Sequence, residues 1–85
     1  SKTFLKDVYR FLFQELNRKP DNHFTLFAIG FIKIKIENKH KKGTYYLKKF
    51  LEKSTDQNPE IEREAERIIM EVPPLRRWER IAAAF

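Results

Sequence analysis

Residues 24–37 have the sequence FTLFAIGFIKIKIE, and the predicted fold depends on how this stretch is interpreted. Its second half alternates apolar and charged side chains: isoleucines occupy the even positions, while Lys33, Lys35 and Glu37 occupy the odd ones. A period of two is typical of a β-strand with one buried face. The first half is apolar at both parities, so the stretch predicts a long strand that begins in the core and runs toward water. Gly30 lies where the character changes and predicts a bulge or bend.

The segments that follow predict a partner for this strand. Residues 38–43, NKHKKG, have the composition of a turn, and residues 44–52, TYYLKKFLE, follow it. The second segment fits two structures, because its apolar residues suit either one face of a helix or alternate positions of a strand. A lone strand is not stable by itself. We therefore interpret the beginning of 44–52 as a strand that pairs with residues 31–37.

Helices are predicted on both sides of this hairpin. Residues 3–18 and 59–72 repeat apolar side chains at three-to-four spacing, and a short helix is predicted over 75–84, after two consecutive prolines. The sequence thus predicts a single α+β domain over 1–85, with an N-terminal helix, an antiparallel β-hairpin or small sheet, and two C-terminal helices. The predicted core residues are Val8, Leu12, Leu16, Leu26, Ile32, Ile34, Leu47, Ile68, Ile69, Val72 and Trp78.

The charge of the chain is uneven. The formal net charge is +6. Residues 1–51 contain twelve Lys and Arg against four Asp and Glu, whereas residues 52–85 contain six against eight. A basic half beside a slightly acidic half indicates a surface that faces a polyanion.

Cysteine is absent, which excludes disulfides, thiolate metal sites and cysteine nucleophiles. No apolar run approaches the roughly 20 residues that a membrane-spanning helix needs. The first residues, SKTFLKDV, lack the layout of a secretory signal because charges interrupt the apolar positions. We expect a cytoplasmic or nucleoid-associated protein.

The search for catalytic or metal-binding residues finds little. The two histidines, His23 and His40, lie beside predicted turns and have no partner at metal-ligand spacing. The glutamates at 60, 62, 64 and 66 form i,i+4 pairs on a predicted helix, but interleaved arginines favour an exposed salt-bridged surface. The two glycines of the chain do not form a phosphate-binding loop. We expect a binding protein without enzymatic activity, metal or cofactor.

Basic residues concentrate on the predicted hairpin. If its two strands pair, their lysines and the turn between them form one cationic β-arm, which fits a DNA groove and neutralises phosphates. Lysines on an exposed sheet edge also protect against aggregation, and this alternative explains Lys33 and Lys35 equally well. The predicted DNA-contacting residues are Lys33, Lys35, Lys39, His40, Lys41, Lys42, Lys48 and Lys49, with Arg76 and Arg77 as a second basic pair.

Three short segments resemble the HU/IHF family of bacterial histone-like DNA-binding proteins. Residues 26–34, LFAIGFIKI, are similar to the glycine-containing strand of the family. Asn58 and Pro59 are similar to the Asn-Pro pair at its arm tip, and residues 72–75, VPPL, to the stretch before its last helix. The resemblance implies an intertwined homodimer that bends double-stranded DNA with little sequence preference. It also implies that Pro59 is a wedge between base pairs.

Two other functions fit the same residues. A protein-interaction module would use the aromatic-rich first helix and the apolar stripe of 61–72 to contact a partner protein, without binding nucleic acid. A single-stranded nucleic-acid binder would stack bases on Tyr45, Tyr46 or Phe50 between lysines. Lysines that converge on one face would favour DNA, and dispersed lysines an interaction module. Exposed rings would favour single strands.

Overall fold

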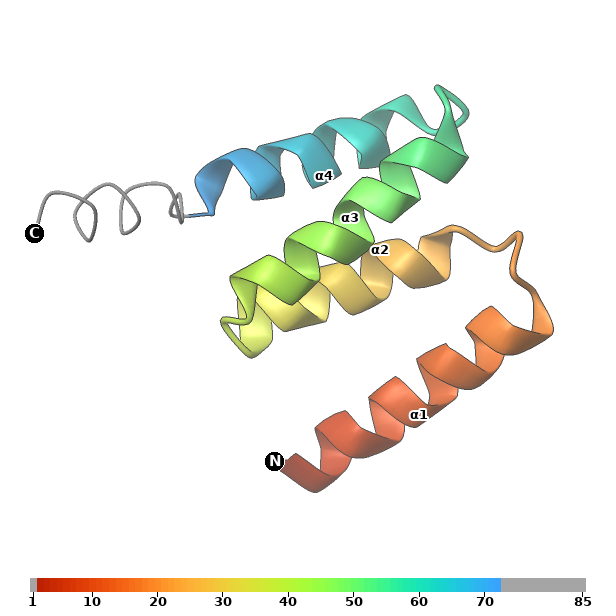
Figure 1. Cartoon of the computed structure of the whole chain (residues 1–85), viewed down its shortest axis with the longest axis vertical. Coiled ribbons are helices and arrows are strands. Elements are labelled where there is room, and N and C mark those ends of the chain that lie inside the picture. Colours follow the sequence, from red (N-terminus) through yellow and green to blue (C-terminus); the bar gives the residue numbers. More distant parts are fainter. Residues whose placement is uncertain (1, 73–85) are drawn as a thin grey trace, which may run out of the picture.

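The computed structural model describes residues 2–72, and there the chain consists of helices joined by short loops (Figure 1). Its elements are α1 (Lys2–Arg18), α2 (Phe24–Phe31), the π-helical segment η1 (Ile32–Ile36), α3 (His40–Ser54) and α4 (Pro59–Glu71). Within the described residues there is no β-strand. The predicted α+β fold, including its HU-like variant, is therefore wrong, and this part of the protein is all-α.

Residues 24–37 form a helix in place of the predicted strand. Leu26, Gly30 and Ile34 are buried at intervals of four residues. These positions share both a strand parity and a helix face, so the same residues fit either pattern. The run from 24 to 32 is apolar at nearly every position, and periodicity cannot assign such a run. A helix satisfies its backbone hydrogen bonds internally and needs no partner strand, and residues 2–72 contain no strand that could serve as one.

α2 continues without a break into η1. Ile32 has helical backbone angles, and the N–H of Glu37 donates to the carbonyl oxygen of Ile32 at 3.1 Å, a step of five residues. A π-helical turn is rare and is often found at functional sites. The two segments form one helix that ends at a short turn, residues 37–39.

α2 and α3 form a closely packed antiparallel helix pair. Asn38 in the turn has φ 57°, a left-handed conformation that asparagine tolerates. A Cβ atom on Gly43 would lie 2.3 Å from Cγ1 of Ile34 and 2.9 Å from the carbonyl oxygen of Gly30. The two glycines thus allow the backbones to approach where the helices cross.

The predicted β-hairpin is also wrong, because its second strand is a helix as well. Residues 38–43 form the turn and the first residues of α3, and residues 44–52 lie inside that helix. On a strand, Leu47 and Phe50 would point to opposite faces. On α3 both side chains are fully buried on one face. The core therefore favours the helical alternative for this segment.

The core lies between α2, η1, α3 and α4. Its contiguous cluster of buried residues is Leu26, Ile34, Leu47, Phe50, Ala65 and Ile68, and Ile29 of α2 is also fully buried. The predictions for Leu26, Ile34, Leu47 and Ile68 are confirmed. The other predicted core residues are only partly buried, namely Val8, Leu12, Leu16, Ile32, Ile69 and Val72. Ile29, Phe50 and Ala65 are buried but were not predicted. Trp78 lies outside the described residues.

One buried carboxylate holds the loop between α3 and α4. Glu62 accepts hydrogen bonds from Ser54 Oγ at 2.7 Å and from the backbone N–H groups of Asn58 and Asp56 at 2.8 and 3.0 Å. The Ser54 hydroxyl and these N–H groups hold the pKa of Glu62 below its ordinary value. Pro59 occupies the first position of α4, which suits a proline. The arm tip that a wedge would need is therefore missing from the described residues.

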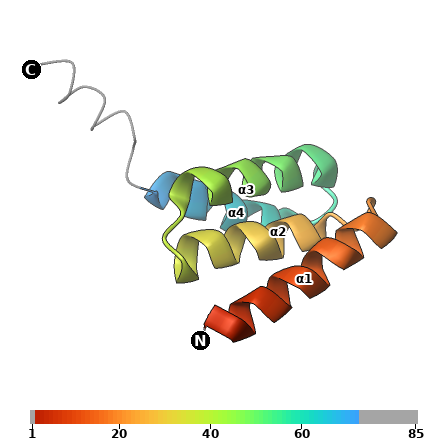
Figure 2. The ribbon, with the colours of Figure 1, turned by 60° about the horizontal axis from the view of Figure 1, so that its bottom comes forward.

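α1 lies along α2 at the edge of the molecule (Figure 2). Over residues 3–18 none of its side chains is buried, and Phe11 is 61% exposed. The ring of Phe13 packs edge-on against Tyr46 of α3, with 6.3 Å between ring centroids. Along residues 2–72, no helix combines the length and the apolar composition needed to cross a membrane.

Candidate nucleic-acid interface

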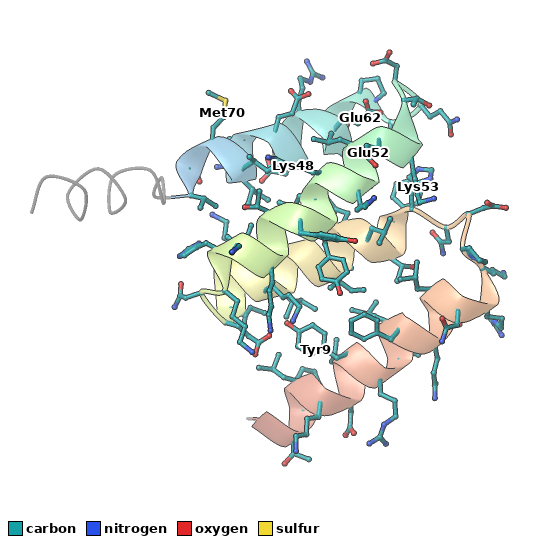
Figure 3. All side chains as sticks on the ribbon, viewed as in Figure 1. Tyr9, Lys48, Glu52, Lys53, Glu62 and Met70 are labelled. Carbon is teal, nitrogen blue, oxygen red and sulfur yellow. The ribbon has the colours of Figure 1, made fainter. Side chains whose placement is uncertain are left out.

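The outer face of α3 carries five exposed lysines. Its inner face buries Gly43, Leu47 and Phe50 at helical spacing, which leaves the opposite face to solvent. That face is formed by Lys41, Lys42, Lys48, Lys49 and Lys53, and we call these residues the α3 lysine face. Figure 3 labels Lys48 and Lys53 together with Glu52, the single acidic residue of α3. The helix therefore presents a strongly positive surface.

Most of the α3 lysine face has no ion-pair partner within residues 2–72. Lys49 has one, because its Nζ lies 3.6 Å from Oε2 of Glu52, and it also lies 5.7 Å from the centroid of the Tyr45 ring. The lysines without an ion pair there are Lys41, Lys42, Lys48 and Lys53. Such exposed ammonium groups can contact phosphates and release the counterions of a polyanion.

Glu37 gathers the polar contacts at the turn before α3. The Tyr9 hydroxyl donates to its carboxylate, and the Nζ atoms of Lys39 and Lys33 lie 3.4 and 4.0 Å away. The Nζ of Lys33 also lies 4.5 Å from the centroid of the Tyr9 ring. The Tyr9 hydroxyl and Lys39 hold the pKa of Glu37 below its ordinary value, while burial lowers the pKa of Lys33. These contacts join α1 to the turn.

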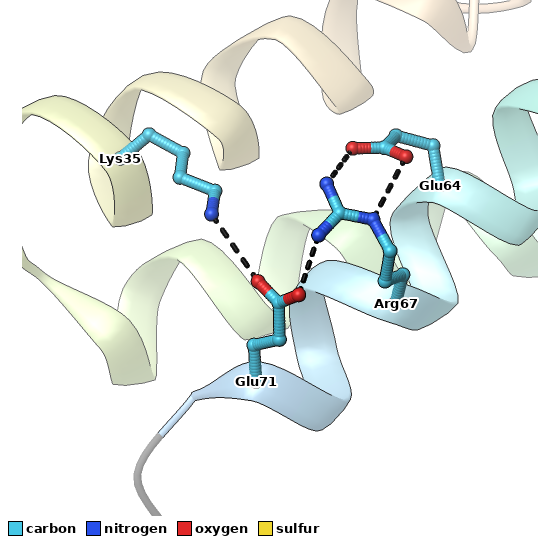
Figure 4. A network of polar contacts seen from close by, with 4 residues as sticks. All are labelled: Lys35, Glu64, Arg67 and Glu71. Atoms are coloured by element: carbon cyan, nitrogen blue, oxygen red, sulfur yellow. Dashed lines mark hydrogen bonds and ion pairs between the residues drawn. The ribbon is translucent and has the colours of Figure 1, made fainter.

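Lys35 belongs to another surface of the molecule. Its Nζ lies 3.4 Å from Oε2 of Glu71, and Arg67 bonds to both Glu71 and Glu64 (Figure 4). The Arg67 guanidinium holds the pKa of both carboxyl groups below their ordinary value. The exposed salt-bridged surface predicted from the glutamates at 60, 62, 64 and 66 is therefore confirmed for Glu64 with Arg67 and is wrong for Glu62, which is buried. Lys35 forms its ion pair with Glu71 of α4 and is not part of the α3 lysine face.

A groove lies beside the α3 lysine face, between α1, η1 and α3. Its lining residues are Phe13, Lys33, Lys41, Lys42, Tyr45 and Tyr46. The groove has a volume of about 560 Å³, and among the described residues no Asp or Glu lines it. Two lysines of the α3 lysine face thus border a surface that is also aromatic.

The predicted basic residues lie in three places and do not form one arm. Lys41, Lys42, Lys48 and Lys49 share the outer face of α3, Lys33 and Lys39 surround Glu37, and Lys35 pairs with α4. His40 is half-buried at the start of α3, and its Nδ1 has no hydrogen-bond partner within residues 2–72. Arg76 and Arg77 lie outside the described residues.

Sequence reasoning missed Lys53 and Phe13. The signal for Lys53 was available, because Lys42, Lys49 and Lys53 follow helical spacing once 44–52 is assigned to a helix. No sequence signal selects Phe13 from the other aromatic residues of α1. Of the three rings proposed to stack on bases, Tyr45 is 52% exposed, Tyr46 is half-buried and Phe50 is fully buried. Phe50 is therefore excluded from that role.

Metal-binding geometry is not found within residues 2–72, where no three His, Asp or Glu side chains are grouped to hold an ion. The comparisons with protein-family models, with curated proteins and with solved structures found no match to the chain. The HU/IHF resemblance stays a prediction.

Proposed function

We propose that the protein binds DNA with little sequence preference and contacts phosphates through the α3 lysine face. One observation carries this proposal: five exposed lysines share the outer face of a helix whose inner face is buried in the core. A buried inner face fixes the direction in which the lysines point. The β-arm expected from the sequence has no part in this mechanism.

The dimensions and composition of α3 support phosphate contact. The helix has 15 residues, and at about 1.5 Å per residue it is about 22 Å long. A helix of this kind fits the major groove or lies across a phosphate backbone. α3 contains no Arg, Asn or Gln, so Lys is its only side chain that can read base edges in two-point contacts. Lys binds phosphates mainly as a point charge, without the two-pronged geometry of Arg. This composition favours binding that depends on phosphates and little on sequence.

The test is a titration of a random duplex of about 30 base pairs, read by fluorescence anisotropy at about 50 and about 200 mM salt. We expect the affinity to fall steeply with salt, because each phosphate contact releases counterions. The double variant Lys41→Glu/Lys48→Glu should weaken binding at least about tenfold and reduce the slope of log K against log salt by about 2.

A matched control changes the same charge elsewhere. Lys6 and Lys19 are exposed and belong to α1 and the loop after it, so Lys6→Glu/Lys19→Glu alters the net charge equally without changing a residue of the α3 lysine face. We expect this control to keep most of the affinity. Equal losses in the two double variants would mean that only net charge matters, and the proposed face would be wrong.

A second candidate function is protein–protein association, including the homodimer expected from the sequence. Phe11, Ile36 and Met70 are 61%, 56% and 85% exposed, which is high for large apolar side chains. Light scattering at several concentrations tests this candidate. If the candidate is right, the wild-type protein is a dimer and the Phe11→Ser variant is a monomer. A wild-type protein that is monomeric at all concentrations would exclude the homodimer.

A further inference from the structure

We propose that the groove between α1, η1 and α3 binds an unpaired nucleobase, so that single-stranded nucleic acid is the preferred ligand. This inference rests on the proposed function, because the α3 lysine face would supply the phosphate contacts on either side of the bound base. It specifies whether the protein prefers single-stranded or duplex nucleic acid, because phosphate contacts alone do not distinguish the two.

The aromatic residues of the groove form a row from α1 to α3. The ring of Tyr46 packs edge-on against both neighbours, with centroids 6.3 Å from Phe13 and 5.3 Å from Tyr45. Phe13 and Tyr45 are 38% and 52% exposed, so ring surface is open to a ligand at both ends of the row. Exposed aromatic faces beside lysines are the pattern on which unpaired bases stack.

The charges around this row call for an anionic ligand. Lys33, Lys41 and Lys42 line the groove, and no Asp or Glu of residues 2–72 is in its lining. Lys33 already pairs with Glu37 at 4.0 Å, so Lys41 and Lys42 supply the positive charge that has no ion-pair partner there. Lys33 is held in place, since its Nζ lies 4.5 Å from the centroid of the Tyr9 ring and its side chain is only 12% exposed. A ligand that is flat and aromatic at one point and carries phosphates nearby satisfies both features.

The size of the groove agrees with a base and its sugar. Its volume of about 560 Å³ falls within the range of about 300–1,000 Å³ that is usual for small-ligand sites. Bases in a duplex have their faces covered by stacking and show only their edges in the grooves. Stacking on Tyr45 therefore requires a base that has left the duplex or belongs to a single strand.

The experiment compares three ligands that contain similar phosphates. They are a labelled oligothymidine strand of about 20 nucleotides, the same strand with abasic residues, and a duplex of equal length. We expect the wild-type protein to bind the thymidine strand about tenfold more tightly than the abasic strand or the duplex, a difference of about 1.4 kcal/mol. Equal binding of the thymidine and abasic strands would overturn the inference.

Variants of Tyr45 test the stacking itself. Tyr45→Ala should weaken binding of the thymidine strand about tenfold and change binding of the abasic strand less than about twofold. Tyr45→Phe keeps the ring and should bind like the wild type. Tyr45 is half exposed, and circular dichroism of both variants checks that the helices persist. If Tyr45→Ala weakened binding of both the thymidine and the abasic strand, or of neither, a base bound in the groove would be contradicted.

Two further comparisons separate the sources of failure. If Lys41→Glu/Lys48→Glu weakens every ligand while Tyr45→Ala weakens none, the phosphate-binding function holds and the base site is wrong. If the lysine variant has no effect on any ligand, the proposed function itself is wrong. Free thymidine monophosphate carries the same base and phosphate chemistry, and we expect it to compete poorly at equal nucleotide concentration. Equal competition would mean that the groove binds a free nucleotide, and single-stranded nucleic acid would be excluded as the preferred ligand.

Discussion

α1 and the unit formed by α2, η1, α3 and α4 are both amphipathic in sequence, yet their apolar side chains are buried to different extents. Every residue of the core cluster comes from the second unit. α1 contributes no fully buried side chain over residues 3–18: half-buried Leu16 packs against the core cluster, and the Tyr9–Glu37 hydrogen bond and the Phe13–Tyr46 ring contact add to this attachment. An apolar stripe predicts that a helix packs, but it does not predict how much of the stripe is covered.

This difference bears on the proposed base site. The groove lies where the two regions meet, with Phe13 from α1 and the remaining lining residues from η1 and α3. α3, whose inner face is buried in the core, fixes the direction of the lysines, while α1, which has no fully buried side chain over residues 3–18, sets the width of the aromatic row. Local opening free energies differ within one protein, and elements with few buried contacts open most easily.

The strongest test of the comparison is a phenylalanine-to-alanine change in each region. Phe50 is fully buried and Phe11 is 61% exposed. We expect Phe50→Ala to lower the free energy of unfolding by about 3–5 kcal/mol, because it leaves a cavity in the core. Phe11→Ala should change it by less than about 0.5 kcal/mol. Urea unfolding followed by circular dichroism measures both, and similar effects would mean that α1 shares the core.

Gly43→Ala tests the close crossing of α2 and α3. On an exposed helix this change stabilises by about 1 kcal/mol. Here the new Cβ would meet the carbonyl oxygen of Gly30 at 2.9 Å and the Ile34 side chain at 2.3 Å, so we expect a loss of about 1–3 kcal/mol. Thr44→Ala, one position along the same helix, is the control. A stabilised Gly43→Ala variant would show that the helices can separate without cost.

The Glu62 carboxylate makes the stability of the α3–α4 loop depend on pH. Its pKa in the folded protein is lower than its ordinary value of 4.5, chiefly because of the Ser54 hydroxyl and the Asn58 N–H. Its contribution is therefore complete above pH 4.5 and is lost as the pH falls through the folded pKa.

Glu62→Gln should remove this part of the acid dependence and lower the thermal midpoint at neutral pH. Glu37, Glu64 and Glu71 also have lowered pKa values, so the difference between variant and wild type isolates Glu62. Melting curves between about pH 3 and about pH 7 measure this difference, since carboxyl groups titrate over that range. A constant difference across the range would contradict the ionised role of Glu62.

Tyr9→Phe should have a small effect that is confined to α1. The change removes the hydroxyl that donates to Glu37, and a hydrogen bond of this kind contributes about 1 kcal/mol. We expect faster hydrogen exchange at the amides of α1 and unchanged protection in α3. Tyr45→Phe serves as the control for loss of a tyrosine hydroxyl. Faster exchange in both helices would mean that α1 and α3 open as one unit.

The sequence was sufficient where a segment had a single periodicity and clear ends. Residues 3–18 and 59–72 were predicted as helices, and the structure confirms both as α1 and α4, with Pro59 at the first position of α4. It was insufficient for 24–37 and 44–52, where apolar residues satisfy a period of two and a period of 3.6 together. The sequence shows how many lysines this region contains, but it could not predict that they lie on three different surfaces.

Composition and local pattern alone therefore determined a basic, cysteine-free chain with helices at residues 3–18 and 59–72 and lysines concentrated between 33 and 53. Tertiary packing determined the rest. Burying Leu47 and Phe50 on one face requires a helix, and that helix turns its lysines outward as a single surface. The physical reason is that an ambiguous segment adopts the structure that covers its largest apolar side chains, and the covering residues come from elsewhere in the chain.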